Sequence, residues 1–94
     1  MSGMRSVEQP CVSVIMSVYN GARFLEESIR CLLGQTIRDF ELIIIDDGST
    51  DETGEIARRY VERDGRVRVL RQPNLGLTRA LNNGFAQARG TYVA

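Results

Sequence analysis

The sequence predicts an α/β fold of the Rossmann-like kind, in which helices flank a mostly parallel β-sheet. Short apolar, β-branched runs alternate with amphipathic segments in the order β-α-β-α-β-α-β. The run "ELIIIDDGST" (residues 41–50) is apolar without alternation, which is typical of a parallel strand covered on both faces. The segments between the expected strands are long enough for helical crossovers, which join parallel strands with right-handed connections.

The first half of the chain is expected to form two strands and the helix between them. The first strand covers residues 11–18 and is broken by Asn20 and Gly21. A helix is predicted over residues 22–33, because apolar side chains recur at helical spacing at Leu25, Ile29, Leu32 and Leu33. The second strand covers residues 40–46 and ends at the acidic pair Asp46 and Asp47.

The second half repeats this alternation. Ser49 followed by Glu52 fits a capping box, so a second helix should start there and run to about residue 64. It would bury Ile56, Ala57, Tyr60 and Val61. The charged and apolar alternation of residues 66–70 indicates a strand nearer a sheet edge. A third helix is expected over residues 77–88, ended by Gly90, and residues 91–94 begin a fourth strand.

Composition excludes several classes of protein. The chain has 94 residues, with 12 basic and 12 acidic side chains, so it holds one domain at most and lacks the basic surplus of a nucleic-acid-binding surface. No apolar stretch approaches the length of a membrane span, and residues 1–10 lack the apolar centre of a signal peptide, so the expected location is the cytoplasm. Residues 1–10 are expected to be flexible.

Cys11 and Cys31, which lack metal-site or redox spacing, are expected to be buried free thiols.

The acidic pair is the principal candidate for ligand binding, because ligands of open α/β sheets bind at the carboxyl ends of the strands. Neither GxGxxG nor GxxxxGK[ST] is present, which argues against a dinucleotide cradle and a P-loop. Tyr19 after the first strand could lie against a nucleotide base, and a carboxylate could accept a hydrogen bond from the ring N–H of uracil or thymine. Adjacent strand residues point to opposite faces, so Asp47 is favoured for the ligand, Asp46 for a structural role, and a chelating pair is disfavoured.

Three of these residues have an alternative structural interpretation. Tyr19 would then only cover the core. Asn20 would cap the first helix. Arg79 would be a solvated residue of the third helix, although a helix amino terminus suits a diphosphate.

Three segments together resemble the start of a family 2 glycosyltransferase, an inverting enzyme with a GT-A fold. They are "VSVIMSVYNGARFLEESIRCLLGQT", "DFELIIIDDGSTDETGEIARRY" and "RVRVLRQPNLGLTRALNNGFAQARGTYVA", and they cover the chain from Val12 onward. The resemblance implies a nucleotide-diphosphate sugar donor, most often UDP-linked. It places Ser17 and Tyr19 against the uridine, Asp47 on the uracil N–H, and Gly76 and Arg79 near the ribose and diphosphate. The predicted nucleotide-binding set is Ser17, Val18, Tyr19, Asn20, Asp46, Asp47, Gly48, Gly76 and Arg79.

The resemblance also implies which parts of the site to expect elsewhere. The family's metal-binding D-x-D motif and its catalytic base follow segments like "RGTYVA", so we expect no catalytic or metal-binding residue here. Residues 11–94 would be the amino-terminal, donor-binding part of an enzyme that uses Mg²⁺ or Mn²⁺ and a carbohydrate or lipid-linked acceptor, at the inner face of a membrane if other segments attach it. The strand begun at residues 91–94 would favour self-association. The alternative is a non-catalytic nucleotide-binding or interaction module of the same fold.

Overall fold

The computed structural model of this chain describes residues 10–35, 39–90 and 92–93. Seven elements alternate as expected, and the four strands form one sheet in the order β3-β2-β1-β4 with parallel pairing throughout. The elements are β1 (Val12–Val18), α1 (Ala22–Leu33), β2 (Phe40–Asp47), α2 (Thr53–Arg63), β3 (Val67–Gln72), α3 (Leu77–Gln87) and β4 (Tyr92–Val93). The Rossmann-like fold class is therefore confirmed. The expectation of a flexible segment over residues 1–10 falls outside the described residues, except for Pro10.

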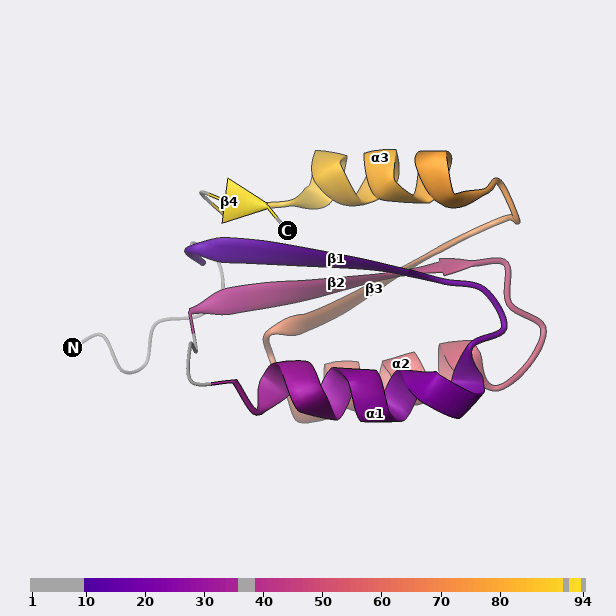
Figure 1. Cartoon of the computed structure of the whole chain (residues 1–94), viewed down its shortest axis with the longest axis horizontal. Helices are drawn as coiled ribbons and strands as arrows, with labels where there is room; N and C mark the ends of the chain where they lie inside the picture. The colour runs from indigo at the N-terminus through magenta and orange to yellow at the C-terminus, as the bar shows by residue number, and fades with distance from the viewer. Residues whose placement is uncertain (1–9, 36–38, 91, 94) are drawn as a thin grey trace.

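The helices divide between the two faces of the sheet: α1 and α2 cover one face and α3 covers the other (Figure 1). The chain passes from β1 through β2 to β3 in one direction and then returns to place β4 on the other side of β1. Right-handed crossovers put helices on opposite faces when the direction of winding reverses. The reversal lies between β1 and β4, and in such sheets the crevice at the reversal is where ligands bind.

Strand β2 forms the centre of both cores, which explains its unbroken apolar run. Its even-numbered residues, including Leu42 and Ile44, pack with the helices α1 and α2. Its odd-numbered residues Ile43 and Ile45 pack with Ala80 of α3. Since each face of β2 is covered, no position along it can be polar without a partner. The strand extends one residue further than predicted, to Asp47.

Helix α1 has the predicted bounds, and its apolar stripe faces the sheet. Leu25 and Ile29 are buried, while Leu32 and Leu33 are half-buried against the same cluster. The helix ends at its C-cap residue Gly34, whose backbone N–H makes a last helical hydrogen bond to the carbonyl of Arg30. The stripe predicted for α2 is likewise inward, with Ile56, Ala57 and Tyr60 buried and Val61 half-buried.

The predicted capping box at the start of α2 is wrong. The helix begins at Thr53, four residues later than Ser49, and the backbone N–H of Thr53 donates to Asp51 Oδ1 at 2.9 Å. Ser49 is occupied elsewhere: its Oγ accepts from the backbone N–H of Asn20, and its own N–H donates to Asp46. Tertiary contacts of Ser49 have therefore replaced the local cap.

Helix α3 is shorter than expected and packs closely on the sheet. It ends at Gln87, and Gly90 instead lies in the turn into β4, where a side chain would meet the backbone of Ser13. A Cβ added at Gly84 would lie 2.5 Å from Ile15 Cγ2, so α3 touches β1 at this glycine. Leu77 and Phe85, which belong to the apolar pattern of this helix, are exposed.

A buried carboxylate joins α3 to the sheet at the amino end of the strands. Glu41 of β2 is 0 % exposed and accepts hydrogen bonds from Ser13 Oγ (2.5 Å), the backbone N–H of Arg89 (2.7 Å) and Arg68 Nη2 (3.0 Å). Ser13 Oγ in turn accepts from the backbone N–H of Gly90. Burial raises the pKa of Glu41, but these donors outweigh it and hold the pKa below 4.5. Sequence analysis did not single out this residue.

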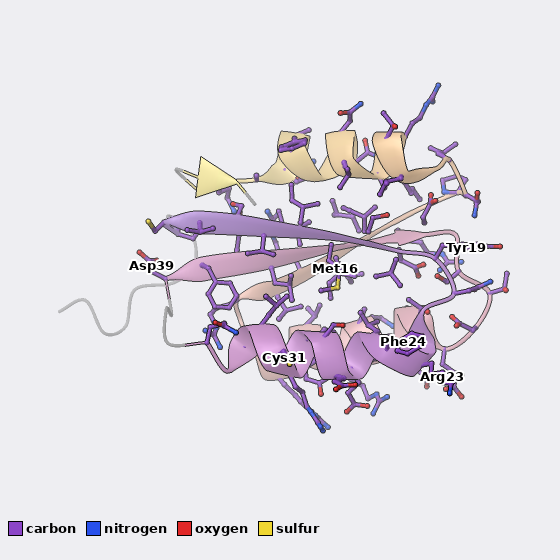
Figure 2. The ribbon with its side chains drawn as sticks, viewed as in Figure 1. Met16, Tyr19, Arg23, Phe24, Cys31 and Asp39 are labelled. Carbon is purple, nitrogen blue, oxygen red and sulfur yellow. The ribbon has the colours of Figure 1, made fainter. Side chains whose placement is uncertain are left out.

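The cysteines differ from expectation in one respect. Both are free thiols, as predicted, but both are exposed rather than buried. Cys11 lies just before β1, and Cys31 lies on α1 (Figure 2). Neither side chain belongs to the two core clusters of the sheet. In the part of the chain that the structure describes, no helix is long and apolar enough to span a membrane.

Candidate functional site

Three loops gather at the carboxyl edge of the sheet: β1 to α1, β2 to α2, and β3 to α3 (Figure 1). The predicted nucleotide-binding residues all lie on these loops, at the strand ends that lead into them, or in the first turn of α3. The parallel sheet thus brings together residues that are more than 50 positions apart in sequence. This places the predicted residues at one edge of the sheet, where a single ligand could contact several of them.

Asp47 lies at the end of β2 on the side of α3 and is 5 % exposed. Its Oδ1 accepts from Gln72 Nε2 at 2.7 Å and from the backbone N–H of Leu75 at 2.9 Å. Its Oδ2 accepts from the backbone N–H of Gly76 at 3.1 Å. The hydrogen bond from Gln72, followed by the one from Leu75, lowers the pKa of Asp47 below its ordinary 3.8. The side chain is therefore a fixed, ionised acceptor.

Asp46 points to the opposite face, toward α2, as the alternation along a strand predicts. It is 1 % exposed, and its Oδ2 pairs with Arg71 Nη1 at 2.7 Å while Oδ1 accepts from the backbone N–H of Ser49. A Cβ on Gly54 would lie 2.9 Å from the same Oδ2, so the first turn of α2 closes over the carboxylate. These contacts agree with the structural role favoured for Asp46.

Asn20 does not cap α1, the alternative left open above. It adopts the left-handed conformation with φ 51°, and its side-chain Oδ1 accepts from the backbone N–H groups of Thr50 (2.8 Å) and Asp51 (3.3 Å). The start of α1 is instead served from the next loop: Asp51 Oδ2 accepts from Ala22 N–H, and Thr53 Oγ1 accepts from Gly21 N–H. The first two loops of the edge are thus joined into one unit.

The other predicted residues occupy the same edge with different exposure. Ser17 and Val18 end β1 beside Ile45 and Asp46 of β2. Tyr19 follows them, is 54 % exposed and extends from the end of the sheet (Figure 2). This exposure leaves the ring accessible to a ligand. Arg79 is exposed on the first turn of α3, in keeping with either interpretation given above.

Two glycines give the edge its shape. Gly48 has φ 79°, and a Cβ there would lie 2.7 Å from the backbone nitrogen of Asn74, so the loops after β2 and β3 touch at this position. Gly76 has φ 98° and immediately precedes α3 without a side-chain cap. Both conformations disfavour any residue with a Cβ.

Sequence reasoning missed three side chains around the two acids: Arg71 and Gln72, which donate to them, and Asn83, which donates to Gln72. Arg71 lies beside Asp46 and Gln72 beside Asp47 in the register of β2 with β3. Pairing the carboxyl ends of the two expected strands would have found them. Asn83 of α3 donates from Nδ2 to Gln72 Oε1, a contact that only the packing of α3 on the sheet creates.

The described residues do not fit a divalent metal ion. Within 10–35, 39–90 and 92–93 no three side chains of the metal-binding types come together. Asp46 and Asp47 point to opposite faces, and each is already engaged by donors. Hard cations take several oxygen ligands around one point, which this pair cannot supply.

Fold and edge together define a Rossmann-like α/β domain with a polar, pre-formed loop cluster at the carboxyl ends of its strands. The chain belongs to Glycosyl transferase family 2, whose family model matches residues 13–94. It is 50% identical over 84 residues, 89% of this chain and 24% of the relative, to the uncharacterized glycosyltransferase EpsJ of Bacillus subtilis.

Two solved structures share the fold. One is the mannosyltransferase PcManGT from Pyrobaculum calidifontis in complex with GDP-Man and Mn²⁺, with a TM-score of 0.77 and 29% identity over 85% of this chain and 25% of that one. The other is S. aureus TarS 1-349, with a TM-score of 0.80 and 29% identity over 88% of this chain and 26% of that one. The chain therefore spans about a quarter of the length of the relatives it matches.

Proposed function

We propose that this chain forms the donor-nucleotide half of a glycosyltransferase site and binds the nucleoside diphosphate of an activated sugar, UDP-linked in the first instance. The observation that carries the proposal is Asp47, a fixed ionised acceptor at the carboxyl edge of the sheet. Membership of Glycosyl transferase family 2 and the likeness to a protein bound to GDP-Man and Mn²⁺ support a nucleotide-sugar donor.

Asp47 suits the recognition of a base that carries a ring N–H. Of its two oxygens, Oδ1 has two donors and Oδ2 has one among the described residues. A carboxylate offers about four acceptor positions, so one remains on Oδ2. Both uracil and guanine have a ring N–H that can donate a hydrogen bond to this position. Tyr19, exposed at the neighbouring strand end, supplies an aromatic face for the same base.

The rest of the donor would extend from the base toward α3. Gly76 leaves the first backbone N–H groups of α3 without a side-chain cap, and a helix amino terminus favours a diphosphate. In the whole protein, an acceptor hydroxyl would displace the nucleoside diphosphate directly, with inversion at the sugar carbon. A divalent metal would stabilise the leaving diphosphate through ligands outside the described residues. The reaction would take place in the cytoplasm.

The test compares the affinity for UDP of variants at the predicted contacts with that of matched controls, by calorimetry on the full chain. Asp47→Asn should weaken UDP about tenfold or more, because it places an amide donor where an acceptor is needed. Tyr19→Ala should also weaken UDP. Phe24→Ala should not, although Phe24 is an aromatic residue that is also exposed, at the start of α1 (Figure 2).

Two results would contradict this assignment. One is unchanged UDP affinity in a correctly folded Asp47→Asn protein. The other is a loss confined to Asp46→Asn, which would move the base contact to the other carboxylate. Failure of the wild-type chain to bind any nucleoside diphosphate would refute the proposed function itself.

A further inference from the structure

A line of side chains connects Asp47 to the middle of α3. Asn83 Nδ2 donates to Gln72 Oε1, and Gln72 Nε2 donates to Asp47 Oδ1 at 2.7 Å. Gln72 is 7 % exposed and Asp47 is 5 % exposed, whereas Asn83 is at the surface. The line therefore starts in solvent on α3, crosses the end of β3 and stops at the proposed base contact.

The direction of this line is set by its chemistry. A glutamine amide has one acceptor end and one donor end. With Oε1 engaged by Asn83, Gln72 can present only Nε2 to Asp47. A buried amide turned the other way would place its oxygen against a carboxylate oxygen, an arrangement that Asp47 could accept only by binding a proton.

We propose that Gln72 and Asn83 are positioning residues that hold Asp47 as a hydrogen-bond acceptor and thereby make the site select bases with a ring N–H over bases without one. Uracil and guanine belong to the first group. Cytosine and adenine present an unprotonated ring nitrogen, which would face the carboxylate as a second acceptor. The inference rests on the proposed function, because it assigns how the same site chooses its nucleotide.

Other charged groups near Asp47 do not supply this control. On the adjoining positions Asp46 and Arg71 pair with each other on the opposite face of the sheet. Arg79 is exposed on α3, and no ion pair to Asp47 occurs among the described residues. The remaining donors to Asp47 are the backbone N–H groups of Leu75 and Gly76, which bind its oxygens whichever way Gln72 turns.

Asn83→Asp is the variant designed to reverse the direction of the two hydrogen bonds that link Asn83, Gln72 and Asp47. A carboxylate at this position attracts Gln72 Nε2, turns Oε1 toward Asp47 and favours a proton on Asp47. Asn82→Asp is the matched control, since it adds the same charge at the next, exposed position of α3. UDP and CDP affinities of the full chain would be measured by calorimetry between about pH 5 and 7, where an unperturbed Asp is ionised.

We expect the wild-type chain and Asn82→Asp to bind UDP at least about tenfold more tightly than CDP, as the loss of one buried hydrogen bond implies. In Asn83→Asp, the ratio of the two affinities should fall by about tenfold, with the largest fall at the lowest pH. An equal loss for both nucleotides would mean that Asn83 only supports the structure, and would overturn the inference.

A second measurement needs no nucleotide. The carboxyl carbon of Asp47, followed by NMR during an acid titration, should report a higher pKa in Asn83→Asp than in Asn82→Asp. Equal values in the two variants would refute the inference even if UDP binds as proposed. Conversely, a raised pKa without any nucleotide binding would uphold the line of hydrogen bonds and refute the proposed function.

Discussion

Removing the buried carboxylate of Glu41 is expected to destabilise the domain severely. In Glu41→Ala, the hydroxyl of Ser13, the guanidinium of Arg68 and the backbone N–H of Arg89 lose their shared acceptor. Ser13 is 0 % exposed, so water cannot replace the carboxylate there without entering the interface between α3 and the sheet. Breaking a buried charge pair from one side costs about 3–5 kcal/mol of unfolding free energy.

Glu41→Gln separates the charge of this residue from its shape. The amide keeps one oxygen for Ser13 and Arg89 but turns an N–H₂ group toward Arg68, so we expect a smaller cost of about 1–3 kcal/mol. The assay is urea unfolding followed by circular dichroism. Glu27→Ala serves as control, because Glu27 is exposed on α1. If Glu41→Ala lost no more stability than Glu27→Ala, the claim that this carboxylate joins α3 to the sheet would be refuted.

Three further predictions concern stability. Asn20→Ala should cost about 1–2 kcal/mol of unfolding free energy, measured by urea unfolding, because it removes the acceptor for the backbone N–H groups of residues 50 and 51. Asn20→Gly loses the same acceptor but should cost less, because glycine tolerates φ 51°. The reverse order would contradict the role of the left-handed conformation. Gly84→Ala should lower stability by about 1–3 kcal/mol, because its Cβ would clash with Ile15. Gly65→Ala is the control and should be neutral, since nothing lies within 4 Å of its added Cβ. Equal effects in thermal melts would show that α3 can move away from β1. Acid should destabilise the fold, because folding lowers the pKa of several carboxyl groups from their ordinary 3.8 or 4.5. The stability that these carboxylates contribute is complete above the ordinary pKa values and is lost as the pH falls through the lower pKa values of the folded state. Urea midpoints that stayed constant between about pH 6 and 3 would contradict this. The carboxylates concerned are Glu41, Asp47, Asp51 and Asp64.

The order and type of the elements could be predicted from the sequence because they depend on local periodicity. The stripe of α1 gave its exact bounds, and the run of β2 identified a strand covered on both faces. The opposite orientation of Asp46 and Asp47 follows from the geometry of any strand, so it too needed no structure. The start of α2 could not be predicted in this way, since Ser49 is taken by a loop 29 positions away.

Local sequence patterns were thus enough to predict the fold class, the family and the edge at which the acids lie. The use of each acid depends instead on contacts that form only in the folded domain. Arg71 and Gln72 reach the acids through the register of β3 with β2, and Asn83 reaches Gln72 through the packing of α3. A buried carboxylate takes its role from the donors around it, and those donors come from elements distant in sequence, whose contacts no local pattern encodes.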